Sequence, residues 1–191
     1  FLDALGSVWD LGGNGDTFVE AGTFLEGTST VRYSGTTPNI LRTAYNNLVI
    51  DTQSGGSVTA VAPVTGLQVL GNLTVGALST STLNLTANDP LTAVGGDVYI
   101  GLLGTILASN SNTLDVFGSF DNDGTFTANG GLVEFLQVGS SATIAAGNSP
   151  FADMLISGSA DYTMTESATT TNDMIVGGGT FTLQSGEVLA V

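Results

Sequence analysis

Short strand-like segments recur along this chain at an interval of about 20–25 residues, and this repeat constrains the fold more than any other feature. Each repeat unit has an apolar strand, a Gly-Thr turn and a second short strand. The clearest units cover residues 96–108, 118–128 and 173–183. The chain also contains a second repeat with a longer period. Val31-Arg32-Tyr33 resembles Val133-Glu134-Phe135, about a hundred residues later. Nested repeats of this kind are typical of stacked structural units.

The segments themselves predict an all-β chain. They are rich in β-branched and aromatic residues and are bounded by Gly, Asn, Asp and Ser. No window of about 12 residues has a helical apolar period without glycine. With about 22 residues in each coil, residues 1–191 would form one all-β repeat domain of about eight or nine coils, a parallel β-helix. An antiparallel β-sandwich is the alternative, although it does not account for the repeats.

Aromatic and branched side chains within the repeat units are the predicted core. In a β-helix, each inward residue stacks on its counterparts in the coils above and below. The residues that we expect in this stack are Phe120, Phe126, Phe135, Phe151, Val69, Val98 and Val116.

The charge balance excludes several classes of function. The chain has 2 Lys+Arg, 17 Asp+Glu, no His and no Cys, which gives a net charge of −15. With Arg32 and Arg42 as the only cations, it cannot neutralise a run of phosphates, so no nucleic-acid partner is expected. Without His, Cys or Lys it lacks the usual bases and nucleophiles, so we predict that it is not an enzyme. No stretch approaches about 18 consecutive apolar residues, so no membrane span is expected.

Carboxylates are the remaining groups that can carry chemistry. Asp121 and Asp123 flank Asn122 before a glycine, and they offer hard oxygen ligands for calcium, the one cofactor we consider. Residues 12–16 partly resemble a glycine-rich calcium-binding repeat with Asp16 as a ligand. The same Asp-Asn-Asp-Gly run is also an ordinary tight-turn sequence. A third interpretation is glycoside cleavage by the carboxylate pair. The only basic side chains that could assist, those of the two arginines, are far from Asp121 in sequence.

Two asparagines begin triplets that fit the N-glycosylation pattern. Asn72 and Asn84 are each followed by Leu and Thr. In an extracellular protein both triplets would be candidate acceptors, although a chain rich in Asn and Thr contains such triplets by chance.

The units at Gly96–Ala108 and Gly118–Ala128, with the strand at Phe151–Ile156, resemble the repeat unit of large secreted β-helix surface proteins of the adhesin and autotransporter-passenger type. The resemblance covers most of the chain, and residues 58–66 depart from its pattern. It implies an exported, right-handed parallel β-helix that serves adhesion, a surface coat or a filament. Flat threonine arrays on such solenoids bind ice, so pairs such as those in residues 125–127 and 180–182 imply an ice-binding alternative. Thr is also simply a common strand residue.

Both ends of the sequence are apolar, and terminal solenoid coils expose unpaired backbone and apolar core. We therefore expect that the chain is part of a longer protein or that its ends are covered by copies of itself. The residues expected at such contacts are Phe1, Leu2, Leu5, Val188, Leu189 and Val191. The function predicted is that of an extracellular or cell-surface structural protein that self-assembles into a filament, sheath or surface layer. The alternatives are an adhesin-type module that binds glycan or ice, and a polysaccharide-cleaving enzyme.

Overall fold

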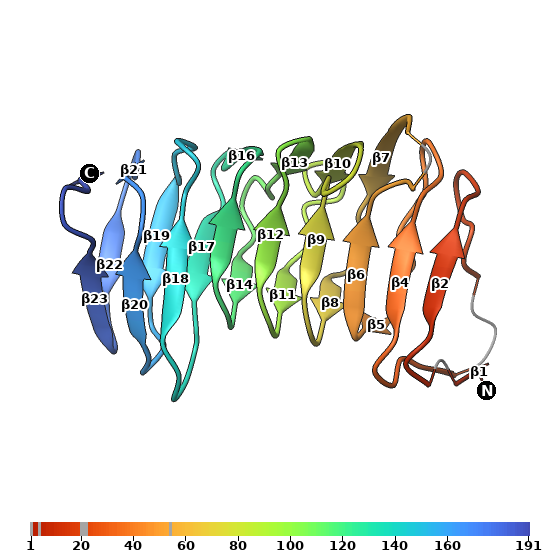
Figure 1. The fold of residues 1–191 in the computed structure, drawn as a ribbon, viewed down its shortest axis with the longest axis horizontal. Helices are drawn as coiled ribbons and strands as arrows, with labels where there is room; N and C mark the ends of the chain where they lie inside the picture. The colour runs from red at the N-terminus through yellow and green to blue at the C-terminus, as the bar shows by residue number, and fades with distance from the viewer. Residues whose placement is uncertain (1, 4, 20–22, 54) are drawn as a thin grey trace.

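The computed structural model describes residues 2–3, 5–19, 23–53 and 55–191, and over these ranges the chain forms a parallel β-solenoid (Figure 1). The described residues form strands, bridges and turns but no helix. Every strand pairing among them is parallel. The prediction of an all-β parallel solenoid is therefore confirmed, and the antiparallel sandwich is wrong.

Three sheets form the faces of the rod in the described part of the chain. The nine-stranded sheet contains β2 (Val8–Leu11), β4 (Thr30–Tyr33), β6 (Asn47–Ile50), β9 (Leu73–Val75), β12 (Val98–Ile100), β15 (Phe120–Asn122), β18 (Ala142–Ala145), β20 (Asp161–Met164) and β23 (Thr180–Leu183). The seven-stranded sheet contains β5 (Ala44–Tyr45), β8 (Leu67–Val69), β11 (Thr92–Val94), β14 (Leu114–Val116), β17 (Leu132–Phe135), β19 (Asp153–Ile156) and β22 (Met174–Val176). The four-stranded sheet contains β7 (Ser57–Val61), β10 (Thr80–Asn84), β13 (Gly104–Leu107) and β16 (Thr125–Thr127). Two short pairs join β1 (Leu2–Asp3) to β3 (Phe24–Leu25) and β21 (Ala168–Thr169) to β24 (Leu189–Ala190).

One coil passes through the three sheets in a fixed order. After β6 the chain enters β7 in the four-stranded sheet, then β8 in the seven-stranded sheet, and it returns to β9 beside β6. Figure 1 shows the coils advancing from the N-terminus at one end of the rod to the C-terminus at the other. The described strands of the nine-stranded sheet are separated by eight steps, in agreement with the predicted eight or nine coils. Coil length varies, because Val31 and its partner Leu48 are 17 residues apart whereas Leu48 and Leu73 are 25 apart.

Inward side chains stack in columns because neighbouring strands pair in register. One column on the nine-stranded sheet contains Val31, Leu48, Leu73, Val98, Phe120, Ile144 and Met164, all of them buried. The seven predicted core residues are all buried, which confirms that prediction. The Phe120 ring lies edge-on to Phe126 and Phe151, with ring centres 5.4 and 5.7 Å apart. Each fully buried side chain of this size contributes about 1.5–3 kcal/mol relative to an exposed one.

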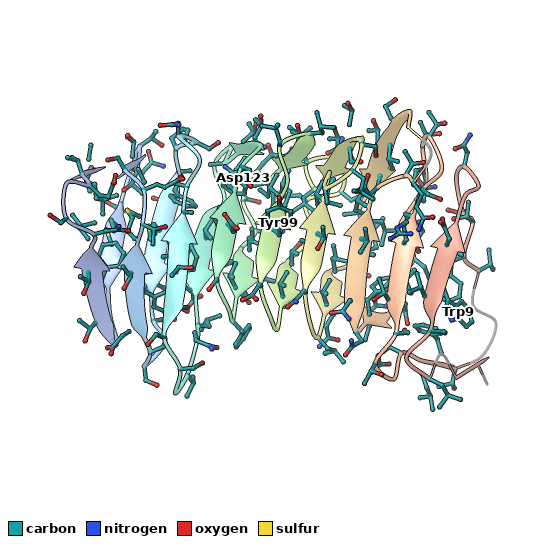
Figure 2. All side chains as sticks on the ribbon, in the orientation of Figure 1. Trp9, Tyr99 and Asp123 are labelled. Carbon is teal, nitrogen blue, oxygen red and sulfur yellow. The ribbon has the colours of Figure 1, made fainter. Side chains whose placement is uncertain are left out.

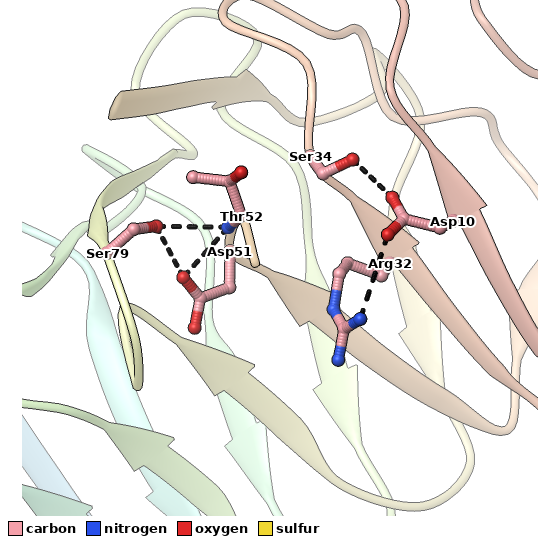
Figure 3. A network of polar contacts seen from close by, with 6 residues as sticks. All are labelled: Asp10, Arg32, Ser34, Asp51, Thr52 and Ser79. Carbon is pink, nitrogen blue, oxygen red and sulfur yellow. Dashed lines mark hydrogen bonds and ion pairs between the residues drawn. The ribbon is translucent and has the colours of Figure 1, made fainter. Parts of the chain in front are cut away.

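A buried carboxylate organises one corner between the nine-stranded and four-stranded sheets (Figure 3). Asp51 follows β6, and its Oδ1 accepts hydrogen bonds from the Thr52 N–H at 2.8 Å and from the Ser79 hydroxyl. Its Oδ2 accepts from the Leu78 N–H at 2.7 Å. A buried carboxylate is tolerated when hydrogen-bond donors occupy its oxygens. Asp51 therefore ties its own coil to the next one.

Residues 58–66, which depart from the repeat pattern, still continue the solenoid. β7 pairs with β10 in register over five residues, and the inward side chains of Val58 and Ala60 are buried. Pro63 comes after the strand. The departure therefore falls in the turn that follows β7 and not in the strand.

Gly104 opens β13 at a point where two coils come into close contact. A Cβ on this residue would lie 2.2 Å from the Val75 carbonyl oxygen. Gly104→Ala is therefore expected to lower the free energy of unfolding by about 1–3 kcal/mol, because the backbone must shift to make room. Urea denaturation measures the loss. Gly12→Ala is the matched control, since its Cβ would meet the Ser34 hydroxyl at an ordinary 3.7 Å, and equal losses in the two variants would contradict the packing argument.

Candidate functional site

A shallow polar groove of about 280 Å³ lies on the outer face of the nine-stranded sheet and crosses β9, β12, β15 and β18. We call it the sheet groove. Its outward side chains are Asn72, Thr74, Asp97, Tyr99, Ser119, Asp121 and Thr143. Tyr99 (Figure 2) lies between Thr74 on one neighbouring strand and Asp121 on the other. The groove thus brings together Asn72 and Asp121, two of the predicted site residues.

A ladder of hydrogen bonds from backbone to side chain runs along the sheet groove. The Asn47 Oδ1 accepts from the Asn72 N–H at 3.0 Å, and the Asn72 Oδ1 accepts from the Asp97 N–H at 2.9 Å. The Asp97 Oδ1 accepts from the Ser119 N–H at 2.8 Å, and the Ser119 hydroxyl accepts from the Thr143 N–H at 3.1 Å. Each side chain therefore holds the next coil in place. This ladder was not predicted from the sequence, although a short polar residue directly before β9, β12 and β15 is a visible signal for it.

Carboxylates give one end of the sheet groove a strong negative charge. The Tyr99 hydroxyl donates a hydrogen bond to the Asp123 Oδ2 at 3.3 Å. Desolvation and the charges of Asp123 and Glu166 raise the pKa of Asp121. Desolvation and the neighbouring Asp123 and Asp121 carboxylates also raise the pKa of Tyr99. The groove therefore favours a hydroxyl-bearing or cationic ligand over an anion.

The residue between the two aspartates points inward. Asn122 is buried, its Nδ2 donates to the Ala146 carbonyl at 2.8 Å, and its Oδ1 accepts from the Gly124 N–H at 3.1 Å. Asn122 therefore caps the bend at residues 123–124, as the tight-turn interpretation expects of an Asn side chain, although Asp121 and Asn122 themselves belong to β15. Strand alternation then places Asp121 and Asp123 outward, where both are exposed.

The two predicted calcium positions lie far apart on the rod. Asp16 follows β2, which is five strands from β15, and its Oδ1 accepts from the Asn39 Nδ2 at 2.9 Å. Among the residues that the structure describes, no three acidic side chains converge into a metal-binding group. Asp121 and Asp123 offer two carboxylates from one turn, and calcium binding there and at Asp16 stays a prediction.

The two predicted glycosylation acceptors differ in their surroundings. Asn72 is exposed in the sheet groove. Asn84 ends β10 and is half-buried, and its Oδ1 accepts from the N–H and the hydroxyl of Thr86 at 2.9 and 2.8 Å. Glycan attachment at either side chain stays a prediction.

Four threonines form a straight outward row on the four-stranded sheet. The register places Thr59, Thr82, Thr105 and Thr125 opposite one another on consecutive strands, and we call them the threonine rank. Their hydroxyls repeat at the strand spacing of about 4.8 Å. A second row on the nine-stranded sheet contains residues 143, 163 and 182. The threonine pairs predicted from the sequence lie along single strands. Neither row was predicted, because the rows cross the strands.

The two arginines lie outside the sheet groove. The Arg32 guanidinium is 3.7 Å from the Asp10 Oδ2, and Asp10 also accepts a hydrogen bond from the Ser34 hydroxyl (Figure 3). Arg32 is on β4, four strands from β15. Arg42 is exposed and lines a second groove of about 380 Å³ with Gln68 and other residues. Among the described residues that line the sheet groove, none is basic.

The residues predicted for subunit contact fall on the two end coils, except Phe1, which lies outside the described residues. Leu2 belongs to β1, where it pairs with Phe24, and Leu5 is exposed. Val188 and Val191 are exposed, and Leu189 packs partly against the core. These positions leave the predicted contacts untested.

The last described coil presents part of its inward surface to solvent. These side chains continue the buried columns of the preceding coil, but they are only partly covered. We call this surface the open coil face, and it contains Met174, Val176, Phe181, Leu183 and Leu189. All five side chains belong to the last described coil, at one end of the rod.

No protein-family model, curated protein or solved structure matches this chain. None of the described residues forms a helix long and apolar enough to cross a bilayer. The sheet groove, the threonine rank and the open coil face are the surfaces from which a function can be inferred.

Asp121→Asn tests the charge in the sheet groove. Because folding raises the pKa of Asp121, its ionised form opposes folding, and this cost appears as the pH rises through the folded pKa. The variant is expected to raise the Tm at pH 7, because it removes the carboxylate whose ionisation opposes folding. At about pH 3 the wild-type side chain is largely protonated, so the Tm difference is expected to vanish. Thermal denaturation followed by circular dichroism measures both values, and an equal gain at the two pH values would contradict the charge argument.

Proposed function

We propose that this chain is an extracellular or cell-surface structural protein that self-assembles into a filament, sheath or surface layer. The observation that carries the proposal is the in-register parallel stack, in which the same inward apolar positions recur from coil to coil. A further coil with the same alternation extends such a rod, whichever chain supplies it. The extracellular assignment rests on the composition, which is acidic, lacks lysine and is rich in Gly, Thr and Asn.

The open coil face supports the proposal as a contact surface. Val176 lies in line with the buried Ile156 of the preceding coil, yet it is 50% exposed. Covering apolar surface of this kind is favourable by about 25 cal/mol for each Å² removed from water. The edge of β23 also offers backbone N–H and C=O groups to another strand. Apolar contact and strand pairing would therefore act at the same end of the rod.

The distribution of charge supports growth along the rod. Asp51 is the one carboxylate among the described side chains that is fully buried, and the other described acidic side chains are exposed or half-buried. With a net charge of −15, like charges on the sides of neighbouring rods repel one another. The side chains of the open coil face include no carboxylate, so contacts made through them meet less of this repulsion than contacts between the sides of two rods.

Val176→Asp tests self-assembly. The wild-type chain is expected to form extended particles in negative-stain microscopy and to sediment increasingly with concentration. The variant places a carboxylate in the open coil face, where assembly would bury it without a partner. We expect the polymerised fraction to fall at least about tenfold, which corresponds to a loss of about 1.4 kcal/mol.

Ile175→Asp is the matched control for this experiment. Ile175 is 55% exposed, close to the value for Val176, but it stands opposite Leu155 on the outer face of the seven-stranded sheet. The control is expected to assemble like the wild type. Equal loss of assembly in both variants, or a wild-type chain that stays monomeric at high concentration, would contradict the proposal.

An adhesin-type binding module is the second candidate function. In the sheet groove, the half-buried Tyr99 ring lies beside carboxylate, amide and hydroxyl groups, and this combination suits a sugar ring. The threonine rank instead presents hydroxyls at a regular interval, which suits the ordered water of an ice surface. The module would then recognise a glycan through one surface or ice through the other.

Tyr99→Ala and Thr82→Tyr are reciprocal variants for the two ligands. Glycan binding, measured on a glycan array, is expected to be lost in Tyr99→Ala and kept in Thr82→Tyr. Thermal hysteresis, the measure of ice binding, is expected to be lost in Thr82→Tyr and kept in Tyr99→Ala. A wild-type protein that shows neither glycan binding nor thermal hysteresis would exclude this second candidate.

A further inference from the structure

We propose that two copies of this chain pair side by side through the outer face of the seven-stranded sheet, where Arg42 of each copy meets Glu134 of the other. The inference goes beyond the proposed function, because the contact needs neither end of the rod. We call the outer surface of β5, β8, β11, β14 and β17, with the residues that flank these strands, the lateral face (Figure 1). The five strands are consecutive in the sheet, and β11 is the middle one.

Two hollows on the lateral face meet at β11. One has a volume of about 380 Å³ and is lined by Arg42 among other residues. The other has a volume of about 210 Å³ and is lined by Leu70 and Phe117 among others. Gln68 and Ala93 line both hollows. The lateral face is therefore recessed over β8 and β11, with a cation at one side of the recess and apolar side chains at the other.

Three large apolar side chains are exposed around this recess. Leu91 directly precedes β11 and is 51% exposed, Leu70 directly follows β8 and is 45% exposed, and Phe117 directly follows β14 and is 37% exposed. Gly95 directly follows β11 and stands level with Leu70 and Phe117, because the three strands end in register. Covering these side chains removes apolar surface from water, which is favourable by about 25 cal/mol for each Å².

Charge is divided between the two halves of the lateral face. Arg42 is exposed on the β5 side, and among the described residues none forms an ion pair with it. Asp115 and Glu134 stand opposite each other on β14 and β17, on the other side of β11. Desolvation and the charge of Glu134 raise the pKa of Asp115, so the two carboxylates disfavour each other's ionised form. Each half of the face therefore carries the charge that the other half needs.

A two-fold axis along β11 brings the two halves of two copies together. Sheets that pack face to face lie about 10 Å apart, with strand directions within about 30° of each other. Rotation about an axis that runs along β11, midway between the sheets, places β5 over β17 of the second copy and β8 over β14. The two rods then run in opposite directions. Because the contact is two-fold symmetric, each pair of side chains meets twice.

The register within the sheet determines which side chains meet across this axis. One outward row crosses the five strands and contains Ala44, Gln68, Ala93, Asp115 and Glu134. The axis places Ala93 on its own counterpart, so the smallest side chain of the row stands where the two sheets meet. It places the Gln68 amide, a hydrogen-bond donor, over the Asp115 carboxylate.

Arg42 meets two carboxylates in the same arrangement. Arg42 comes two residues before Ala44, so it lies over Leu132 of the second copy, two residues before Glu134. Two residues along a strand span about 6.6 Å, a distance that an extended arginine side chain covers. Asp153 stands beside Leu132 on β19. The guanidinium would therefore lie between the carboxylates of Glu134 and Asp153, and hydrogen bonds between ionised groups of this kind are strong.

The apolar side chains are matched by the same axis. Leu70 and Phe117 stand level on the two strands that flank β11, so Leu70 of each copy packs against Phe117 of the other. Gly95 lies between them on the axis and leaves room for both side chains. Leu91 meets its own counterpart at the other end of β11. The contact is therefore complementary to itself in shape as well as in charge.

The charges exclude the other two-fold arrangement. An axis along the rod would place every strand of the sheet over its own counterpart. Asp115 and Glu134 would then face the same two carboxylates of the second copy, and Arg42 would face none. Like charges placed against each other in a contact cost several kcal/mol. The lateral face is therefore suited to rods that run in opposite directions and not to rods that run in the same direction.

Charge reversal tests the contact. Sedimentation velocity is measured on the Val176→Asp chain, in which growth through the open coil face is suppressed. At 0.15 M salt the Debye length is about 8 Å, so repulsion between the rods at longer range is screened. We expect a dimer, and we expect Arg42→Glu and Glu134→Arg each to raise its Kd at least about tenfold. The double variant is expected to bring the Kd back to within about threefold of the starting value, because it restores opposite charges across the contact.

The two single variants are controls for each other. They change the net charge in opposite directions, so a general effect of net charge would strengthen the dimer in one and weaken it in the other. Weakening in both without recovery in the double variant would overturn the proposed pairing. A Val176→Asp chain that stays monomeric up to about 1 mM would overturn the contact itself.

Leu91→Asp tests the position of the axis. The substitution places two carboxylates against each other at one end of β11, so the Kd of the dimer is expected to rise at least about tenfold. Leu102→Asp is the matched control, since Leu102 is 80% exposed in the turn after β12, away from the seven-stranded sheet. Its Kd is expected to stay within about twofold of the starting value. Equal weakening in the two variants would overturn the axis.

The same measurements separate this inference from the proposed function. Filaments of the wild-type chain together with a monomeric Val176→Asp chain would overturn the lateral contact and leave the proposed function standing. A dimer that responds to charge reversal as expected, in a wild-type chain that forms no larger assembly, would support the lateral contact and overturn the proposed filament, sheath or layer.

Discussion

The structure depends on the in-register stacking of short parallel strands. Each inward side chain lies about 4.8 Å from its counterpart in the next coil, so a coil must fit two neighbours at once. Phe120 illustrates this requirement, because its ring contacts the rings of Phe126, Phe135 and Phe151. Close contact between coils also explains why Gly104 stands where a Cβ would meet the Val75 carbonyl. The packing of each coil therefore depends on side chains of the neighbouring coils more than on contacts within that coil.

The same stacking determines how the corners are held. Corners interrupt the strand pairing, and their backbone N–H groups need acceptors from elsewhere. Asp51 supplies its two oxygens to the next coil, and Asn122 closes its own turn while bonding the Ala146 carbonyl. The ladder that begins at Asn47 performs the same task at the entry to the nine-stranded sheet. Short polar side chains therefore contribute to coil register as well as to solubility.

The fold and much of the core were predictable because they repeat locally. Phe120 and Phe126 belong to a strand–Gly-Thr–strand unit that is visible along the chain, and both are buried. The threonine rank was not predictable in the same way. Its members are 23, 23 and 20 residues apart, because the turns between strands differ in length. The lengths of those turns determine which outward residues become neighbours. The pattern within a single strand carries no information about turn length. The sheet groove was missed for the same reason, since Tyr99 and Asp121 become neighbours only through the coil register.

Apolar and charged groups lie in different directions on the rod: the apolar contacts run along its axis and the charges lie on its sides. Along the rod axis, neighbouring coils present apolar columns and strand edges, and both kinds of contact are short in range. Around the sides, desolvation and the nearby carboxylates of Asp123 and Glu166 raise the pKa of Asp121. Salt weakens repulsion between exposed carboxylates far more than it changes apolar burial. In the proposed assembly, side-chain packing would therefore set the direction of growth along the axis, whereas charge and the ions that screen it would set the spacing between parallel rods.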